Sequence, residues 1–233
     1  MSQQLPVVVI PGIMSDAVSW RYQLEALSAD RGVIVPGGHY GLPSIKEMAV
    51  DIARQLPQRF DLVGWSMGGY IAFELYPIVT DRIRRLALVN TTARPETEES
   101  AKQRASVVQA VSQKGVREVW LGLLGKLLRE PGRVDAAFQR QVIEAAEKLG
   151  EPVLRSQTAA IIDRRDTRPT LESMRCETLI VAGEHDSVVP LEQSIEINRA
   201  MIHSRLHVIR QAGHLSPWEQ PDEVSHLLRT FFA

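Results

Sequence analysis

The stretch from Asp61 to Leu75, DLVGWSMGGYIAFEL, places Ser66 where an apolar, strand-like run gives way to a helical one. Gly64 and Gly68 flank this serine in the pattern Gly-x-Ser-x-Gly. A sharp turn between a strand and a helix projects a serine hydroxyl above the edge of a sheet, where it can attack a carbonyl group. The short pattern alone produces false matches. Its position between a strand and a helix supports the interpretation of Ser66 as a nucleophile.

A serine hydroxyl needs a neighbouring base to become an effective nucleophile. The best candidate among the six histidines is His214, in a loop that Gly213 opens after the apolar run at residues 206–209. This places it at the carboxyl end of a predicted strand, on the same sheet edge as Ser66. The other histidines are less well placed for this role: His203 and His207 flank the start of that strand, His226 lies on the terminal helix, and His39 and His185 lie in loops.

The base in turn needs a carboxylate that orients it and stabilises its charged form. The run TLIVAGEHDSVVP offers Glu184 and Asp186 after a predicted strand. We choose Asp186, because it lies further beyond the strand, and keep Glu184 as the alternative. Another strand, at residues 86–89, ends at Asn90, an amide that offers no negative charge.

Two backbone amides are candidates for an oxyanion hole. The N–H of Met67 follows Ser66 in the first turn of the predicted helix, where unpaired N–H groups and the positive end of the helix dipole suit an anion. Pro11 and Gly12 form a tight turn after the first strand. We expect this turn to direct the N–H of Ile13 toward the same site.

Six short apolar runs are the predicted strands, at residues 5–10, 33–35, 60–63, 86–89, 178–182 and 206–209. They are continuously apolar, which is typical of parallel strands buried on both faces. Helical patterns separate most of them. We therefore expect an α/β fold with a mostly parallel sheet of about six strands flanked by helices, and a ligand site at the carboxyl ends of the strands.

Residues 94–168 interrupt this alternation, because they carry helical patterns and no convincing strand. We predict a helical cap at 94–168 inserted into a core of residues 1–93 and 169–233. The Leu-rich run VREVWLGLLGKLL, which contains Trp120, is expected to pack on the core or to supply part of an acyl pocket. The arginines and aspartates at 163–168 are interpreted as a salt-bridged return to the core.

Composition and charge favour a protein that acts on a small molecule. The formal net charge of −1 gives no electrostatic reason to expect nucleic acid or an anionic membrane as a partner. With one cysteine, Cys176, no secretory signal and no apolar run near the roughly 20 residues of a membrane span, we expect a cytoplasmic protein. Neither a His-Glu-x-x-His pattern nor a Gly-rich phosphate loop occurs, so we expect no metal and no cofactor. The oligomeric state stays open.

The order Gly-x-Ser-x-Gly, then Asp, then His resembles the α/β-hydrolase superfamily from about residue 5 to the C-terminus. Gly12 and Trp20 are similar to that family's Gly-x7-Trp stretch, and GEHDSVVP and AGHLSPWEQP resemble its acid and histidine loops. The resemblance implies that Ser66 is the nucleophile, His214 the base and Asp186 the acid that orients it. It also implies that the N–H groups of Ile13 and Met67 form the oxyanion hole. It also implies a reduced, all-parallel sheet, because the chain starts at what would be the family's third strand.

Two loops depart from the family pattern. Pro11 stands where the family usually has His before the oxyanion-loop glycine. The loop after the second strand reads PGGHYGLPS in place of a run with Asp and Gly-x-Gly-x-Ser. His39 is therefore a candidate for lining the entrance, and the further candidate substrate-binding residues are Trp65, Trp120 and Trp218.

Three functions are compatible with these motifs. The leading hypothesis is a carboxylesterase-like serine hydrolase that cleaves a small, mostly apolar carboxylic ester or lactone through an acyl-enzyme. The second is hydrolysis of a carbon–carbon bond in a dienoic ketone, because Trp218 stands four residues after His214, where that subgroup often has Trp. The oxyanion loop of that subgroup usually has more glycines than IPGIMS. The third is a non-catalytic ligand-binding member of the fold, against which the intact Ser-His-Asp set argues.

Overall fold

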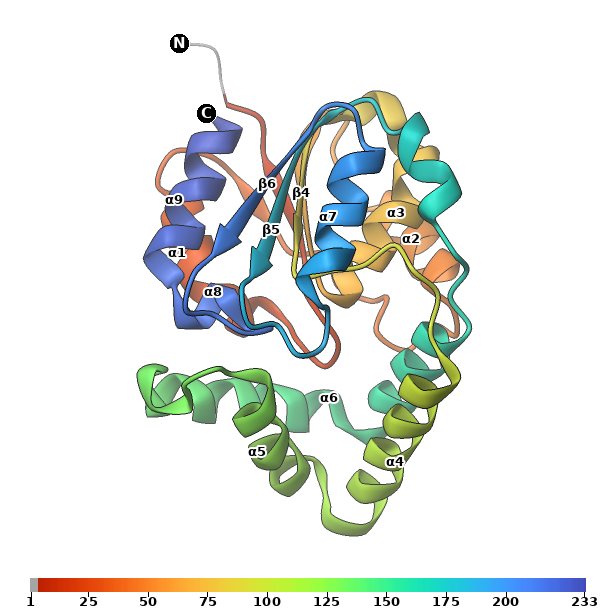
Figure 1. Cartoon of the computed structure of the whole chain (residues 1–233), viewed down its shortest axis with the longest axis vertical. Coiled ribbons are helices and arrows are strands. Elements are labelled where there is room, and N and C mark those ends of the chain that lie inside the picture. Colours follow the sequence, from red (N-terminus) through yellow and green to blue (C-terminus); the bar gives the residue numbers. More distant parts are fainter. Residues whose placement is uncertain (1–3) are drawn as a thin grey trace.

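The protein is built around a six-stranded sheet in which every neighbouring pair of strands is parallel (Figure 1). The computed structural model describes residues 4–233. The strand order is β2-β1-β3-β4-β5-β6. The strands are β1 (Val7–Ile10), β2 (Val33–Ile34), β3 (Phe60–Trp65), β4 (Ile83–Val89), β5 (Glu177–Gly183) and β6 (Ser204–Ile209). The predicted all-parallel sheet is confirmed.

Side-chain alternation along the central strands produces two apolar cores, one on each face of the sheet. Val7 and Val9 of β1 contribute to one core, whereas Val8 and Ile10 contribute to the other. Successive residues of a strand point to opposite faces, so a strand covered on both faces is apolar throughout. The edge strands β2 and β6 are less buried than the central strands, and β6 also contains polar residues.

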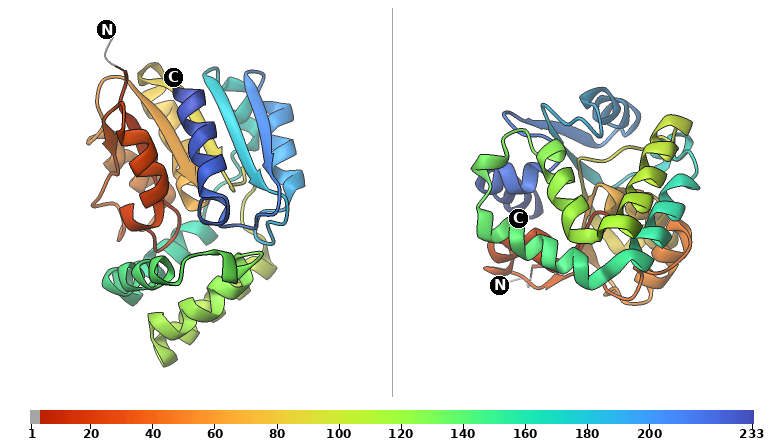
Figure 2. Two further views of the ribbon diagram at one scale, coloured as in Figure 1. Left: turned by 90° about the vertical axis from the view of Figure 1, so that its left-hand side faces the viewer. Right: turned by 90° about the horizontal axis from the view of Figure 1, so that it is seen from below.

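Helices cover both faces of this sheet (Figures 1 and 2). One face carries α1 (Arg21–Ser28) and α9 (Pro221–Phe232), and the other carries α2 (Ile45–Ala53), α3 (Met67–Val79) and α7 (Leu191–Ala200). Ser44 caps helix α2, because its side chain accepts a hydrogen bond from the N–H of Glu47 in the first turn. Shorter elements complete this part: η1 (Ala17–Trp20), η2 (Thr80–Arg82), η4 (Arg168–Ser173) and α8 (Ser216–Glu219).

A layer of three helices lies across the carboxyl ends of the strands (Figures 1 and 2). It consists of α4 (Glu98–Lys114), α5 (Val116–Leu127) and α6 (Ala136–Ile162), with η3 (Pro131–Arg133) before α6. We call residues 98–162 the cap. Gly115, at φ 84°, separates α4 from α5, and Gly150, at φ 77°, bends α6. Positive φ values of this kind favour glycine.

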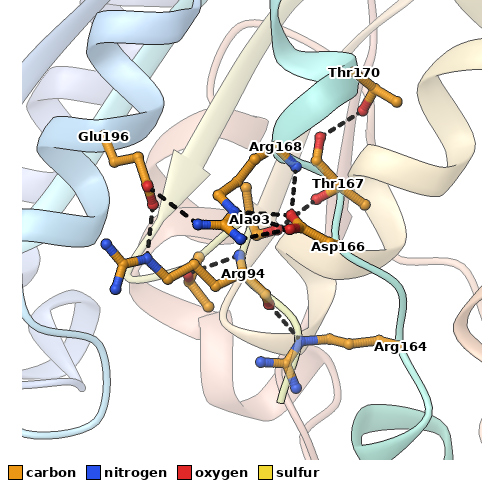
Figure 3. Close-up of polar contacts among 9 residues, drawn as sticks. Ala93, Arg94, Arg164, Asp166, Thr167, Arg168, Thr170 and Glu196 are labelled. Carbon is orange, nitrogen blue, oxygen red and sulfur yellow. Dashed lines mark hydrogen bonds and ion pairs between the residues drawn. The ribbon is translucent and has the colours of Figure 1, made fainter. Parts of the chain in front are cut away.

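The two chain segments that connect the cap to the sheet lie side by side and are bonded to each other (Figure 3). The N–H of Thr167 donates to the carbonyl of Ala93 at 3.0 Å, and Arg164 donates to the carbonyl of Arg94 at 3.1 Å. Arg94 and Arg168 both pair with Glu196 of α7, at 2.8 and 3.6 Å. The predicted salt-bridged return is present, and it anchors the cap to the core at this corner.

Two glycines with opposite surroundings provide a test of the packing between α3 and β1. A Cβ atom at Gly68 of α3 would lie 2.0 Å from the carbonyl oxygen of Ile10, whereas one at Gly122 of α5 would have no neighbour within 4 Å. Gly68→Ala is therefore expected to lower the free energy of unfolding by about 3 kcal/mol or more. Gly122→Ala is expected to raise it by about 0.5–1 kcal/mol, because alanine loses less backbone entropy in a helix. Urea unfolding measures both, and similar midpoints for the two variants would contradict this packing.

Candidate active site

Ser66 occupies the single residue between β3 and α3, and its backbone has φ 52° and ψ −116°. A serine adopts such a conformation only at a cost in free energy. Three hydrogen bonds hold it there: the N–H of Ser66 donates to Val89 at 2.9 Å, while its carbonyl accepts from the N–H of Gly69 at 2.9 Å and from the Thr91 hydroxyl at 2.8 Å. The turn is thus fixed by β4 and the segment that follows it.

The glycines around Ser66 are required by close backbone contacts. A Cβ atom at Gly64 would lie 2.6 Å from the carbonyl oxygen of Gly68, and one at Gly69 would lie 2.2 Å from the Thr91 hydroxyl. These distances are shorter than van der Waals contact, so only glycine fits at either position. The strand and the helix can approach closely enough for a one-residue turn because these side chains are absent.

The three side chains identified from the sequence lie in hydrogen-bond contact. Ser66 Oγ is 3.0 Å from His214 Nε2, and His214 Nδ1 is 2.8 Å from Asp186 Oδ2. The three residues come from the loops after β3, β6 and β5, which meet at one edge of the sheet. All three are buried, with exposed fractions of 9%, 5% and 7% for Ser66, His214 and Asp186. The arrangement allows His214 to accept the Ser66 proton while Asp186 holds the imidazole.

Asp186 is held as a carboxylate by a dense set of donors. Its Oδ1 atom accepts from the N–H groups of Val188 and Val189, both at 2.8 Å. Its Oδ2 atom accepts from Asn90 at 2.9 Å in addition to His214. Burial alone raises the pKa of this carboxyl group, but the opposing charge and hydrogen bond of His214, with the Val189 and Asn90 donors, hold its pKa below the ordinary value. The alternative acid, Glu184, instead accepts from the N–H of Gln211 and lies beside His185.

Asn90 connects the acid to the histidine loop, a role that the sequence did not reveal. Its amide nitrogen donates to Asp186 and, at 3.3 Å, to the carbonyl of Gly213. Its oxygen accepts from the Ser216 hydroxyl at 2.5 Å. An amide can donate and accept at once, which a carboxylate cannot. The available signal is that Asn90 is a polar residue at the carboxyl end of a strand. The sequence argument considered only whether this residue could supply a negative charge.

The loop after β1 lies against Ser66 and is fixed by the cap. A Cβ atom at Gly12 would lie 3.4 Å from Ser66 Cβ. Met14 has φ 50°, and its N–H donates to the side-chain oxygen of Gln157 on α6 at 2.9 Å. Gln157 is fully buried. A cap residue therefore holds the loop that carries the Ile13 amide, and no pattern in the sequence linked positions so far apart.

A pocket of about 290 Å³ opens above Ser66 and His214, between the sheet edge and the cap. Its apolar lining consists of Ile13, Val107, Trp120, Leu123, Leu127, Leu154 and Val188, and its polar lining from the cap consists of Ser100, Gln103, Arg104 and Thr158. A larger hollow of about 510 Å³ lies between α2, α3 and the end of α6, away from Ser66. The smaller pocket is the candidate ligand site because Ser66 and His214 border it.

Of the four expected substrate-binding residues, the structure places one in the lining of this pocket, Trp120. Trp65 and Trp218 pack in the core with ring centroids 5.7 Å apart. Trp65 Nε1 donates to the carbonyl of His214 at 3.4 Å, so these rings support the histidine loop from below. His39 is buried against Tyr40 at 4.4 Å, and burial lowers the pKa of its imidazole. These three residues do not border the pocket.

Glu219 joins the histidine loop to the cap. Its Oε1 atom accepts from the N–H of Gly213 at 2.7 Å, and its Oε2 atom accepts from the N–H of Arg129 at 2.7 Å. The N–H of His214 also donates to the carbonyl of Leu127, at 3.0 Å. Glu219 is 7% exposed. No pattern in the sequence indicates this role; the available signal is the position of Glu219 in AGHLSPWEQP, five residues after His214.

Residues 4–233 offer neither a metal site nor a membrane-spanning helix. No group of three or more His, Cys, Asp or Glu side chains with the arrangement of a metal site occurs in this range. No helix in this range has the length and hydropathy needed to cross a membrane.

Comparison with known proteins places this geometry in a family. The sequence model of the alpha/beta hydrolase family matches residues 7–227. The chain belongs to the alpha/beta hydrolase family. The resemblance predicted from the sequence is thereby confirmed, together with the general class of hydrolase.

The relatives of this chain bear the names of different hydrolases. A 2-hydroxy-6-oxo-2,4-heptadienoate hydrolase from Pseudomonas putida is 30% identical, over 98% of this chain and 89% of that protein. A pimeloyl-[acyl-carrier protein] methyl ester esterase from Neisseria meningitidis serogroup B is 25% identical, over 83% of this chain and 79% of that protein. The structure of a thermophilic esterase from Thermogutta terrifontis has a TM-score of 0.85 at 27% identity, covering 97% of this chain and 88% of that one.

The lowered pKa of Asp186 predicts a pH-dependent contribution to stability. A carboxyl group whose folded pKa lies below its unfolded value, about 3.9, stabilises the folded state above that pH and loses this contribution as the pH falls through the folded pKa. The loss of unfolding free energy in Asp186→Asn, relative to the wild type, is therefore expected to be larger at pH 6 than at pH 3. Urea unfolding at both pH values measures it, and equal losses would contradict the assigned direction.

Glu219→Gln tests the connection between the histidine loop and the cap. The substitution replaces one acceptor oxygen with an NH₂ donor that faces a backbone N–H of Gly213 or Arg129. Opposed donors in a buried site are expected to lower the free energy of unfolding by about 1–3 kcal/mol. Glu223→Gln is the matched control, because Glu223 is a 43% exposed carboxylate paired with His207, and its loss should cost less than about 1 kcal/mol. Equal effects in urea unfolding would rule out a special role for Glu219.

Proposed function

We propose that this protein is a serine hydrolase that cleaves a small, mostly apolar carboxylic ester or lactone through an acyl-enzyme. The observation that carries the proposal is the continuous hydrogen-bonded chain from Ser66 through His214 to Asp186, at 3.0 and 2.8 Å, beneath an apolar pocket. A nucleophile bonded to a base, with that base held by an acid, is the arrangement that acyl transfer requires.

The first half of the reaction forms the acyl-enzyme. Ser66 Oγ attacks the substrate carbonyl carbon while His214 Nε2 takes the hydroxyl proton, and the imidazolium is stabilised by ionised Asp186. The negative charge on the carbonyl oxygen is received by the N–H groups of Ile13 and Met67. His214 then returns the proton to the departing alcohol oxygen as the carbon–oxygen bond breaks. For a lactone, that alcohol stays attached to the acyl group.

The second half releases the acid. Water gives a proton to His214 and its oxygen attacks the acyl carbon, after which His214 protonates Ser66 Oγ as the bond to the serine breaks. Each half stabilises an oxyanion at the same two amides, and a donor of this kind contributes about 10²–10³-fold to kcat. The N–H of Met67 begins α3, so the positive end of that helix adds to the stabilisation.

The pocket supports a small substrate with a substantial apolar part. Its volume of about 290 Å³ lies at the lower end of the range for ligand sites. Leu123 and Leu154 line it together with Trp120, so an acyl chain in this pocket would be removed from water on several sides. Esterase activity in the Thermogutta and Neisseria relatives is consistent with this reading.

Hydrolysis of a carbon–carbon bond is the second candidate, favoured by the Pseudomonas putida relative at 30% identity. The sequence argument for it relied on Trp218, which packs among Trp65 and Phe138 and does not border the pocket. We therefore rank it below ester hydrolysis. Product analysis after incubation with a dienoic ring-cleavage ketone separates the two candidates. This ketone has no ester bond, so an esterase leaves it intact, whereas the second reaction adds water across a carbon–carbon bond and releases two fragments, one of them a carboxylic acid.

Ser66→Ala is expected to abolish turnover of short p-nitrophenyl esters and covalent labelling by a fluorophosphonate probe, because no other serine contacts His214 Nε2 within residues 4–233. The fall in kcat should exceed about 10⁴-fold. Ser106→Ala, on the exposed side of α4, is the matched control and should retain both activities. Wild-type protein with neither turnover nor labelling would refute the proposed function.

A further inference from the structure

The pocket above Ser66 is apolar along much of its lining but contains one arginine, Arg104. No Asp, Glu or Lys borders it among the described residues. Arg104 lies on α4, on the face that also presents Gln103 and Val107 to the pocket. Residues three and four positions apart share one face of a helix, so this wall changes from polar to apolar over a single turn.

Arg104, Arg164 and Glu96 form a cluster with two positive charges and one negative charge. Glu96, whose side chain is 5% exposed, accepts from Arg104 Nε at 3.0 Å and also from Arg164. Arg164 additionally donates to the carbonyl of Ile161 at 2.8 Å and stacks on Tyr70. One carboxylate therefore faces two guanidinium groups, and Arg164 alone is sufficient to pair with it.

The terminal nitrogens of Arg104 are available to a ligand. Within the described part of the chain, Arg104 donates through Nε to Glu96, and its two terminal nitrogens have no protein acceptor. The side chain is 22% exposed and borders the pocket. Two parallel N–H groups of a guanidinium match both oxygens of a carboxylate, and pairing of this kind is stronger than a neutral hydrogen bond.

We propose that the substrate carries a carboxylate, separated from the scissile carbonyl by a short apolar segment, and that Arg104 binds this carboxylate. A monoester of a short dicarboxylic acid has these parts. Its ester carbonyl lies at Ser66, its methylene chain contacts Val107 and Leu154, and its free carboxylate pairs with Arg104. This inference rests on the proposed function, because it names the substrate class of the same site.

Two esters of equal chain length test the proposal: mono-p-nitrophenyl adipate, which carries a carboxylate, and p-nitrophenyl hexanoate, which does not. The wild type is expected to have the higher kcat/KM for the adipate ester. In Arg104→Gln the ratio of the two kcat/KM values is expected to fall by about 10- to 100-fold, the effect of losing a charge-assisted pair. Lys102→Gln removes the same charge from an exposed position on α4 and should leave both values unchanged.

A binding measurement decides the inference without turnover. Adipate is titrated calorimetrically into Ser66→Ala, alone and combined with Arg104→Gln or with Lys102→Gln. Binding that weakens by about 10- to 100-fold with Arg104→Gln and is unaffected by Lys102→Gln supports the proposal. Thermal unfolding checks that Arg104→Gln remains folded, as expected while Glu96 stays paired with Arg164.

The outcomes separate this inference from the proposed function. An unchanged ratio of kcat/KM in Arg104→Gln, or adipate binding that does not depend on Arg104, overturns the inference while turnover of the hexanoate ester upholds the proposed function. Absence of ester turnover and of Ser66 labelling refutes the proposed function. The adipate titration then decides by itself on a carboxylate site at Arg104, which is supported if Arg104→Gln weakens binding and overturned if it does not.

Discussion

The conformation of Ser66 is the constraint on which the site depends. A residue held in this region of φ and ψ costs about 1–3 kcal/mol, and it persists only where its surroundings determine it fully. Three hydrogen bonds to the backbone of Ser66, each with a net worth of about 0.5–1.5 kcal/mol, are sufficient to offset that cost. They come from Val89, Gly69 and Thr91. The position of Ser66 is therefore set by β4, the segment after it and α3 as much as by its own strand.

The parallel sheet brings the remaining parts to this position. Loops after β1, β3, β5 and β6 all leave the same edge, because parallel strands end at the same side of a sheet. The strand order reverses between β1 and β3, so the loop carrying Ile13 and the turn carrying Ser66 are neighbours. Hydrogen bonds to the cap then fix two of these loops. The N–H of Met14 donates to the Gln157 side chain, and the N–H of His214 donates to the carbonyl of Leu127. The cap thus holds two loops of the site in place and also lines the pocket above Ser66.

The sequence predicted what depends on local pattern. Apolar runs predicted the strands, and glycine spacing identified the turn at Ser66. The positions of Asp186 and His214 after strands indicated side chains that the structure brings into contact. Contacts between distant segments were beyond such reasoning. Gln157 and Met14 are hydrogen-bonded although they lie 143 positions apart in the sequence, and Trp218 and Ser19 although they lie 199 apart. No local periodicity connects either pair. The positions of Trp65 beside Ser66 and of Trp218 near His214 in the sequence predicted contact with substrate. In the structure both large apolar rings instead pack in the core beneath the histidine loop.

The ion pairs of Glu96 join the two segments that connect the cap to the sheet and also orient Arg104 in the pocket. Glu96 lies in the segment that enters the cap, and Arg164 lies in the segment that leaves it, so their pairing ties both crossings together. Burial alone raises the pKa of Glu96, but Ser100, Arg104 and Arg164 hold its pKa below the ordinary value, so it is ionised near neutral pH. Ionised Glu96 accepts from the Nε edge of Arg104, which restricts the guanidinium to orientations that leave its terminal edge unoccupied. An arginine already restricted in this way loses less side-chain entropy when it binds an anion. One small cluster of charges therefore joins the two segments that connect the cap to the sheet and holds the guanidinium that borders the pocket.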